Sequence, residues 1–486
     1  MTRTPNTAQA PLYLCIDQGG HASRALVFDG RGALHASSLR TVGVRYPQPD
    51  WVEQDPEELV ASLQDSITEA VAALGDRADR IVSAGIATQR SSIVCWDRRT
   101  GEALSPVISW QDRRAGAWLS RFSSHTEEIH RCTGLRLSAH YGASKLRWCL
   151  DHLPDVSAAQ RAGELAMGPL ASFLLFRLLE EKPLLCDPVN AARTLLWNIR
   201  TQDWDPRLLD LFGIPAATLP RGVPTRHVFG ALRIEQRRIP LAIATGDQSA
   251  ALFALGAPSP ETAYVNMGTG AFIQSAFDHL PEAAGLLAGV VYRDADRTVF
   301  VLEGTVNGAG AALQWAEKEW GLQNVDAQLP AWLARENDIP LFLNGVAGLG
   351  APFWMADFAS RLIGGGEPWQ KMVSVAESIV FLLVTNLERL RTIQPLPARL
   401  LASGGLARHD GLCQRLADLS GVPVYRPAER EATARGTAYL LAGFPGDWPE
   451  DKPGAWFTSK QNSPLSRRYD CWRMEMKQAL KIARGA

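Results

Sequence analysis

The stretch LYLCIDQGGHASRALVFD, residues 12–29, holds two apolar runs separated by a short polar turn. The first run ends at Asp17, and the turn QGGHAS follows it directly. Short apolar runs bounded by glycine are typical of buried β-strands. We therefore predict a strand pair at residues 12–16 and 25–28, with an acid, two glycines and a histidine at its tip.

A similar strand–turn–strand pattern lies in the second half, at residues 263–276 around the turn Gly268-Thr269-Gly270. Another apolar run, residues 400–403, leads into Gly404-Gly405. Glycine lets backbone N–H groups approach a ligand, and successive N–H groups in a turn can bind an anion. Each turn alone is typical of a tight hairpin, but their presence in separate halves favours phosphate binding.

Strand-like and helix-like segments alternate along the chain, which predicts a mixed α/β architecture. The predicted elements include helices at 55–74, 249–255 and 412–419 and strands at 81–86, 93–96, 239–247 and 422–425. The 486 residues exceed what one hydrophobic core usually serves. Because GAPSP at 256–260 is typical of a linker, we predict two domains, at 1–255 and 256–486.

The composition excludes several classes of function. With 46% hydrophobic residues, 21% charged residues and a net charge of −1, the chain predicts neither a nucleic-acid surface nor a basic membrane patch. The N-terminal segment is polar and no apolar run is long enough to span a membrane. The 7 cysteines are scattered without a CxxC pair, which disfavours disulfides or zinc, so we expect a soluble protein of the reducing cytoplasm.

Two aspartates are the strongest candidates for a catalytic or a metal-binding role. Asp247 ends a predicted strand at the start of a helix, where the helix dipole favours a carboxylate that could accept a proton from a hydroxyl. Asp17 adjoins a glycine turn, where a carboxylate could hold Mg²⁺ through water. The structural alternatives are a helix N-cap for Asp247 and an Asx-turn for Asp17.

Other polar residues near strand ends allow both structural and functional interpretations. Gln89-Arg90 follows a predicted strand and could hydrogen-bond a polyol, although arginine more often forms a surface salt bridge. For Asp187 and Asn190, in CDPVNAART, we favour a structural role in a turn.

Taken together, these segments resemble the FGGY family of carbohydrate kinases, and within it most closely the glycerol kinases. The likeness extends over nearly the whole chain and rests on motifs that occur in the family's order: DQGGHASRALVFD (17–29), YPQPDWVEQDP (46–56), ATQRSSIVCWD (87–97), SWQDRR (109–114), DPVNAARTLLWNIRTQDWD (187–205), GDQSAALFALG (246–256), NMGTGAFI (266–273), GLGAPFW (348–354), ASGGLARHDGL (402–412) and ATARGTAYLLAG (432–443).

The resemblance implies two ribonuclease-H-like (actin-like ATPase) domains flanking a nucleotide- and substrate-binding cleft. It implies transfer of the γ-phosphoryl group of ATP, with Mg²⁺, to a hydroxyl of a small polyol or sugar, and a homodimer or homotetramer. Asp247 matches the family's catalytic base, and Asp17 with Asp247 the magnesium-associated carboxylates. The residues matched to the carbohydrate are Gln89, Arg90, Ser91, Trp110, His140, Asp247, Gln248 and Phe272. Those matched to ATP and its phosphates are Gly19, Gly20, His21, Ser23, Arg24, Gly268, Thr269, Gly270, Gly404, Gly405 and His409.

The chain also departs from the glycerol-kinase pattern. Ser91 replaces a glutamate that binds the polyol, His140 replaces a pocket tyrosine, and Gly20-His21 replaces two threonines of the phosphate turn. Since substrate hydroxyls left without partners are costly to bury, we expect a different or larger polyol, or a sugar, in place of glycerol. We expect His21 to contact phosphate itself, the alternative being that it simply faces solvent.

Three alternatives follow from the same motifs. One is an ATP-binding paralogue with weak or no kinase activity that serves as a sensor, which the substitutions at both sites motivate. Another is a ketopentose (xylulose or ribulose) kinase, which ranks below a polyol kinase because the motifs typical of xylulose kinases are not evident. An actin- or chaperone-like ATPase is disfavoured, because the likeness reaches the substrate-site segments.

Overall fold

The structure, a computed structural model, describes residues 10–335, 338–429, 431–450 and 452–484. Packing divides the chain into two compact units. The first comprises Met1–Pro258, Gly289–Phe300 and Arg430–Asp451, and the second comprises Ser259–Ala288, Val301–Glu429 and Lys452–Ala486. The division into domains at 1–255 and 256–486 stays a prediction.

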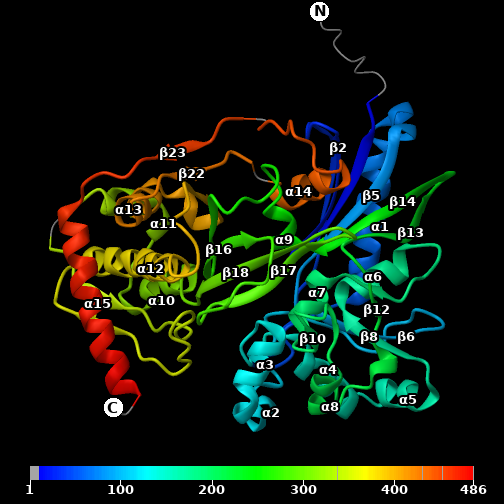
Figure 1. Ribbon diagram of the computed structural model, residues 1–486, viewed down its shortest axis with the longest axis horizontal. Coiled ribbons are helices and arrows are strands. Elements are labelled where there is room, and N and C mark those ends of the chain that lie inside the picture. The colour runs from blue at the N-terminus through cyan, green and yellow to red at the C-terminus, as the bar shows by residue number, and fades with distance from the viewer. Residues whose placement is uncertain (1–9, 336–337, 430, 451, 485–486) are drawn as a thin grey trace, which may run out of the picture. The chain divides into compact units, whose positions relative to one another are not determined.

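The first unit is built on a six-stranded sheet with the order β13-β14-β5-β1-β2-β3, and Figure 1 shows β5, β14 and β13 side by side. The strands are β1 (Leu12–Gln18), β2 (Ala22–Asp29), β3 (Leu34–Thr41), β5 (Ile81–Thr88), β13 (Arg226–Ile234) and β14 (Arg237–Gly246). β1 and β2 form an antiparallel hairpin with Cys15 opposite Leu26. The strand pair predicted from the opening stretch is confirmed.

The direction of three strands positions the site. β1 is parallel to β5, and β5 is parallel to β14. Their last residues lie in one register, with Gln18 opposite Thr88 and Gly246 opposite Thr88. Because parallel strands end at the same edge of a sheet, the segments that follow them meet there.

Helices pack on this sheet and bury its apolar side chains. Helix α1 (Pro56–Ala72) begins after Asp55, whose carboxylate accepts hydrogen bonds from the first-turn amides, as the helix predicted at 55–74 requires. Apolar residues of α1 and α6 (Leu170–Leu178) share one core with the strands.

The predicted helix at 249–255 is partly wrong. The structure has α9 at Asp247–Ala251. The next residues form tighter turns, in which Phe253 N donates to Ala250 O at 2.9 Å and Gly256 N to Phe253 O at 3.1 Å. These bonds join residues three apart and therefore end the α-helical ladder.

The middle of the chain is rich in short helices. A small sheet has the order β4-β7-β6-β8, formed by β4 (Glu53–Gln54), β7 (Val107–Ile108), β6 (Ile93–Asp97) and β8 (Leu165–Pro169). The surrounding helices are α2 (Gly116–Leu119), α3 (Thr126–Thr133), α4 (Gly142–His152), α5 (Pro154–Ala162), α7 (Pro188–Ala191) and α8 (Pro206–Phe212). Short two-stranded pairs join β10 (Trp197–Asn198) to β11 (Asp203–Trp204) and β9 (Leu185–Cys186) to β12 (Arg221–Gly222).

The second unit contains a seven-stranded sheet with the order β17-β18-β16-β15-β21-β22-β23. Its strands are β15 (Thr262–Met267), β16 (Ala271–Phe277), β17 (Leu287–Arg293), β18 (Thr298–Val306), β21 (Arg399–Ser403), β22 (Val424–Arg426) and β23 (Ala455–Phe457). As in the first sheet, an antiparallel hairpin, β15–β16, adjoins a parallel strand, β21. The predicted resemblance between the two strand–turn–strand patterns is therefore confirmed at the level of strand pairing.

The helices of the second unit are α10 (Gly310–Glu319), α11 (Val325–Leu333), α12 (Pro368–Leu390), α13 (Asp410–Ser420) and α15 (Ser463–Ala483), accompanied by the pair β19 (Leu341–Leu343) and β20 (Arg361–Ile363). Helix α14 (Ala432–Leu441) belongs to the first unit. Among the described residues, no helix has the length and apolar character needed to span a membrane.

Candidate active site at the edge of the first sheet

The ends of β1 and β5 are joined by buried glutamines. Gln89 N donates to Gln18 O at 2.8 Å. The Gln89 side-chain amide donates to Gln18 Oε1 at 3.2 Å and to Gln54 Oε1 at 2.7 Å. All three side chains are buried, so these bonds supply the partners that buried amides need. Gln18 and Gln54 were not predicted as site residues, although both lie within or beside motifs quoted for the family resemblance.

The same network continues to the glycine turn and to Trp110. Gln54 Nε2 donates to Gly20 O at 3.0 Å. On the other side, Ser92 Oγ donates to Gln89 Oε1 at 3.0 Å and accepts from Trp110 N at 3.0 Å. One hydrogen-bonded chain therefore links three segments predicted to bind ATP or carbohydrate.

The Trp110 ring in turn lies edge-on to the half-buried His140 ring, with centroids 5.6 Å apart. Burial lowers the pKa of His140 well below its usual range, and Lys145 and nearby arginines lower it further. The Tyr141 ring also lies edge-on to the His140 ring, with centroids 5.0 Å apart.

Asp247 begins α9 directly after β14. Its Oδ1 lies 3.9 Å from Arg90 Nε, and Arg90 also donates to Gln248 Oε1. The carboxylate stays 29% exposed. Burial raises its pKa, while Arg90, the Gln248 N–H group and Arg193 lower it. A raised pKa strengthens a carboxylate as a base while the cations keep it ionisable.

Asp17 lies on the neighbouring strand and is almost fully buried. Arg24 Nη1 donates to its Oδ2 at 3.2 Å. Burial, followed by the charge of Asp247, raises the pKa of Asp17, and Arg24 lowers it, with a net pKa of about 7. The carboxylates of Asp17 and Asp247 therefore interact electrostatically at the edge of the sheet.

Ser91 is a polar residue with an unusual conformation. Its φ is 65°, in the left-handed region that residues other than glycine rarely adopt. Its buried hydroxyl has no hydrogen-bond partner within the described part of the chain. Since nearly all buried polar groups are hydrogen-bonded, this hydroxyl is well suited to bind a polar ligand.

The remaining residues of the first turn differ in their surroundings. The turn itself closes through Gly19 N, which donates to Ala22 O at 2.9 Å. His21 is exposed at the tip. The Ser23 hydroxyl is buried and hydrogen-bonded to Ser62 Oγ of α1 at 2.8 Å, so it is directed toward the helix.

In the second unit, two glycine turns follow adjacent parallel strands. Gly268 N donates to Gly270 O at 2.8 Å after β15. Gly404 follows β21 with a φ of 89°, and a Cβ there would lie 2.6 Å from Met267 O. Only glycine fits this position, because any side chain would be both strained and obstructed.

Four further predicted residues also lie in the second unit. Thr269 O accepts hydrogen bonds from the amide of Ala309, the N-cap of α10, at 3.1 Å and from Ala311 N in the first turn at 3.0 Å. Phe272 is half-buried on β16. His409 is buried, and its Nε2 lies 3.0 Å from Asp326 Oδ1, so its imidazole is bound to the start of α11. Gly405 opens the short helix after β21, with open space at its Cβ position.

Sequence comparison identifies the family. Residues 12–254 match the N-terminal domain of the FGGY family of carbohydrate kinases, and residues 263–443 match its C-terminal domain. The chain belongs to the FGGY family of carbohydrate kinases. It is an ATP-dependent carbohydrate kinase, as the motifs predict.

The kinase resembles known sequences and solved structures over nearly its whole length. Glycerol kinase from Aromatoleum aromaticum is 36% identical over 490 residues, covering 97% of this chain and 98% of that protein. Glycerol kinase from Trichlorobacter lovleyi is 38% identical over 451 residues, covering 90% and 91%.

Solved structures confirm the predicted actin-like ATPase fold. Plasmodium falciparum glycerol kinase with ADP matches at a TM-score of 0.87 and 24% identity, covering 97% of this chain and 98% of that one. Xylulose kinase from Rhodospirillum rubrum matches at 0.84 and 20%, covering 96% and 98%.

Two buried cations of the kinase were not predicted as site residues. Arg193 is buried and lowers the pKa of both Asp247 and His140. It lies in the segment DPVNAART, which carries part of the family likeness. The structural role predicted for Asp187 there is confirmed, because Asp187 caps α7 by accepting from Asn190 N at 3.0 Å. The other cation, Lys145, lies on α4, and no sequence motif around it predicted a place in the site.

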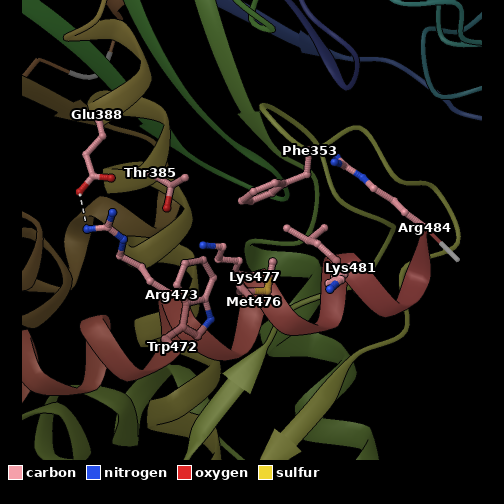
Figure 2. A pocket seen from close by; sticks show the side chains of 10 residues that line it. Phe353, Thr385, Glu388, Trp472, Arg473, Met476, Lys477, Lys481 and Arg484 are labelled. Carbon is pink, nitrogen blue, oxygen red and sulfur yellow. Dashed lines mark ion pairs between the residues drawn. The ribbon is translucent and has the colours of Figure 1, made fainter. Parts of the chain in front are cut away.

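A pocket of about 570 Å³ also occurs in the kinase, within the second unit, and Figure 2 shows its lining. Apolar side chains of α15, among them Trp472 and Met476, lie beside basic ones, and Arg473 pairs with Glu388 of α12 at 3.6 Å. No residue predicted for catalysis or ligand binding is among the residues that line it.

Proposed function

We propose that this kinase phosphorylates a hydroxyl of a small polyol or sugar, with Asp247 as the general base. The observation that carries the proposal is the meeting of Asp17, Gln89-Arg90 and Asp247 at one edge of the first sheet. Phosphoryl transfer requires mainly positioning and charge stabilisation, plus a group that orients the attacking hydroxyl and accepts its proton. The partly exposed Asp247 carboxylate meets the last requirement.

The residues proposed to bind the carbohydrate are Gln89, Arg90, Ser91, Trp110, His140, Gln248 and Phe272. The strongest support within the first unit is the unpartnered buried hydroxyl of Ser91. A serine leaves more room than the glutamate of the glycerol-kinase pattern. We therefore propose a polyol larger than glycerol as the preferred substrate, although the relatives named above are glycerol kinases.

The residues proposed for ATP are the glycine turns at Gly19-Gly20, Gly268–Gly270 and Gly404-Gly405, together with His21, Arg24 and His409. Close backbone approach at Gly404, where a Cβ cannot fit, supports this assignment in the second unit. For Ser23 we propose a contact through the backbone, since its hydroxyl is bonded to Ser62.

Magnesium is the metal expected with ATP, and the residues at the sheet edge fit it. Asp17 and Asp247 offer carboxylate oxygens, which Mg²⁺ prefers, and their raised pKa values show that nearby positive charge would be favourable. The described residues contain no cluster of three or more His, Cys, Asp or Glu side chains that could hold a metal. We therefore propose that both aspartates hold Mg²⁺ through water. When bound, Mg²⁺ would neutralise charge on the phosphates.

The test is ADP release by the purified kinase with ATP and MgCl₂, coupled to NADH oxidation. Glycerol, erythritol, xylitol, D-arabitol, xylulose and ribulose serve as acceptors, with an acceptor-free reaction as the control. The proposal predicts the highest kcat/KM for a four- or five-carbon polyol. Highest activity with a ketopentose would overturn the preference for a polyol in favour of a ketopentose kinase. ATP binding without stimulation by any acceptor would favour the sensor alternative.

We also propose a cytoplasmic location and a homodimer or homotetramer. The 7 cysteines are all free and 6 of them are buried, which supports a reducing compartment. Sedimentation velocity would measure the assembly.

A further inference from the structure

Lys145 of α4 connects three separate segments of the chain. Its side chain is 1% exposed. Its ammonium donates to Ser91 O at 3.1 Å, Ser109 O at 2.8 Å and His140 O at 2.8 Å. A lysine ammonium has three donor hydrogens and no acceptor. All three donors are therefore used on backbone carbonyl groups.

Burying this cation is costly, and the helix does not require it. An ammonium removed from water needs full hydrogen bonding to be tolerated. Lys145 forms no ion pair with a carboxylate in the part of the chain that the structure describes. Helix α4 is already anchored through Leu146, Cys149 and Leu150, which lie in an apolar core. The ammonium group therefore holds the three carbonyl groups against a helix that is anchored independently by its apolar face.

Each of the three carbonyls belongs to a segment proposed to bind carbohydrate. Ser91 follows Gln89-Arg90, Ser109 immediately precedes Trp110, and His140 contacts the Trp110 ring. These segments are distant in sequence, and a single side chain fixes the backbone of all of them.

The hydrogen bond from Lys145 to Ser91 O also holds a strained backbone conformation in place. A residue other than glycine in the left-handed region has a strained backbone that the surrounding structure must hold in place. Lys145 bonds the carbonyl of this same residue. Loss of the bond would let Ser91 relax and would move its unpartnered hydroxyl.

We infer that Lys145 is a positioning residue for the carbohydrate: it holds the backbones of Ser91, Ser109 and His140 so that Ser91, Trp110 and His140 present a preformed binding surface. The inference rests on the proposed function, since it takes these three side chains as contacts of the substrate. Lys145 itself is buried beneath them and acts through them.

The test compares Lys145→Met, Lys145→Gln and a matched control. Met retains the length of the side chain without donors, and Gln retains two donors. Arg435→Met is the control, because Arg435 is equally buried and donates to Gly32 O at 2.7 Å and Ala254 O at 2.9 Å. The measurements are KM for the best acceptor, KM for ATP, and Tm.

We expect Lys145→Met to raise the acceptor KM at least tenfold with less than a twofold change in the ATP KM, and Lys145→Gln to give an intermediate value. Arg435→Met should lower Tm without this selective effect. An acceptor KM within twofold of wild type in both Lys145 variants would overturn the inference.

A second readout needs no substrate and separates this inference from the proposed function. Hydrogen–deuterium exchange should rise in Lys145→Gln in peptides that contain residues 89–92, 109–111 and 138–141, and remain unchanged in peptides from the second unit. Unchanged exchange in all three segments would contradict the positioning role, whichever acceptor the kinase uses.

Discussion

The guanidinium group of Arg90 lies 3.9 Å from the carboxylate of Asp247, across the ends of two parallel strands. Gly246 makes this approach possible. A Cβ at Gly246 would lie 2.5 Å from Arg90 Cδ and 2.6 Å from its Cγ. The absence of a side chain immediately before the proposed base thus determines where its neighbouring cation can lie.

Gly246→Ala should therefore lower activity more than stability. The new methyl group would displace Arg90 from Asp247 and Gln248, and misplacement of about 1 Å near reacting groups can cost about 100-fold in rate. We expect kcat to fall by about 10- to 100-fold. Gly30→Ala is the control, since the nearest atom to a Cβ there is 3.9 Å away. Equal kcat values for the two variants would refute the role of Gly246.

Asp17→Asn should stabilise the folded protein at neutral pH while it lowers activity. The folded-state pKa of Asp17, about 7, lies above the ordinary value of 3.8. Between these values the folded state binds a proton that the unfolded state has released, so stability falls as pH rises through about 7. The amide avoids this loss, so the Tm of Asp17→Asn should exceed that of wild type at pH 8.

The Tm difference between Asp17→Asn and wild type should shrink toward pH 5, where both side chains are neutral in the fold. Thermal unfolding from pH 5 to pH 8 without nucleotide or metal measures it. A variant less stable than wild type at pH 8 would contradict the prediction. Activity should fall, because the neutral amide lacks the negative charge proposed to hold Mg²⁺ through water.

Helix α14 packs so closely on α9 that Gly436 has no room for a side chain. A Cβ at Gly436 would collide with the carbonyl oxygen of Ala250, one turn after Asp247. Gly436→Ala should lower the free energy of unfolding by about 3 kcal/mol or more, in the range of severe overpacking. Chemical denaturation measures this, with Gly446→Ala as control because open space surrounds that Cβ position. Comparable stability of the two variants would disprove the tight packing.

Gly404→Ala tests the proposed nucleotide turn of the second unit. The variant combines an unfavourable φ of 89° with a clash against Met267, so the turn should shift and ATP affinity should fall by about tenfold or more. Gly421→Ala is matched in strain, with a φ of 71° and open space around its Cβ position. Calorimetric titration with ATP should show weaker binding only for Gly404→Ala. The same affinity in both variants would argue against the turn as a nucleotide site.

The strands of the site could be predicted from sequence, but its assembly could not. The apolar runs around the QGGHAS turn predicted the hairpin because burial on both faces produces such runs. The register that places Gln18 beside Thr88, and Thr88 beside Gly246, is a tertiary property without a local signal. Family motifs supplied Asp247 and Arg90 as two residues of one carbohydrate site, and only the strand directions explain why they meet.

Two site residues that were not predicted, and the orientation of a third residue that was, show what the sequence leaves open. Lys145, within GASKLRWCLDH, has the pattern of an exposed cation on an amphipathic helix, and only the fold shows that it is buried. The sequence around Arg193 likewise does not tell whether its side chain is exposed or buried. For Ser23, membership of the turn favoured a ligand contact, whereas its place on β2 directs the hydroxyl to Ser62. Sequence position near a site does not fix which way a side chain points, because strands alternate faces.

The most direct test of the central claim is acceptor-dependent ADP release by Asp247→Asn, measured together with ATP affinity by calorimetry. Asn has nearly the same size and keeps a hydrogen-bond acceptor, but it cannot take the proton of the attacking hydroxyl. General-base catalysis contributes about 10²- to 10⁴-fold. We predict a loss of kcat in that range with ATP affinity within a few-fold of wild type. A variant that retains wild-type kcat would contradict the account, because Asp247 would then not be the base.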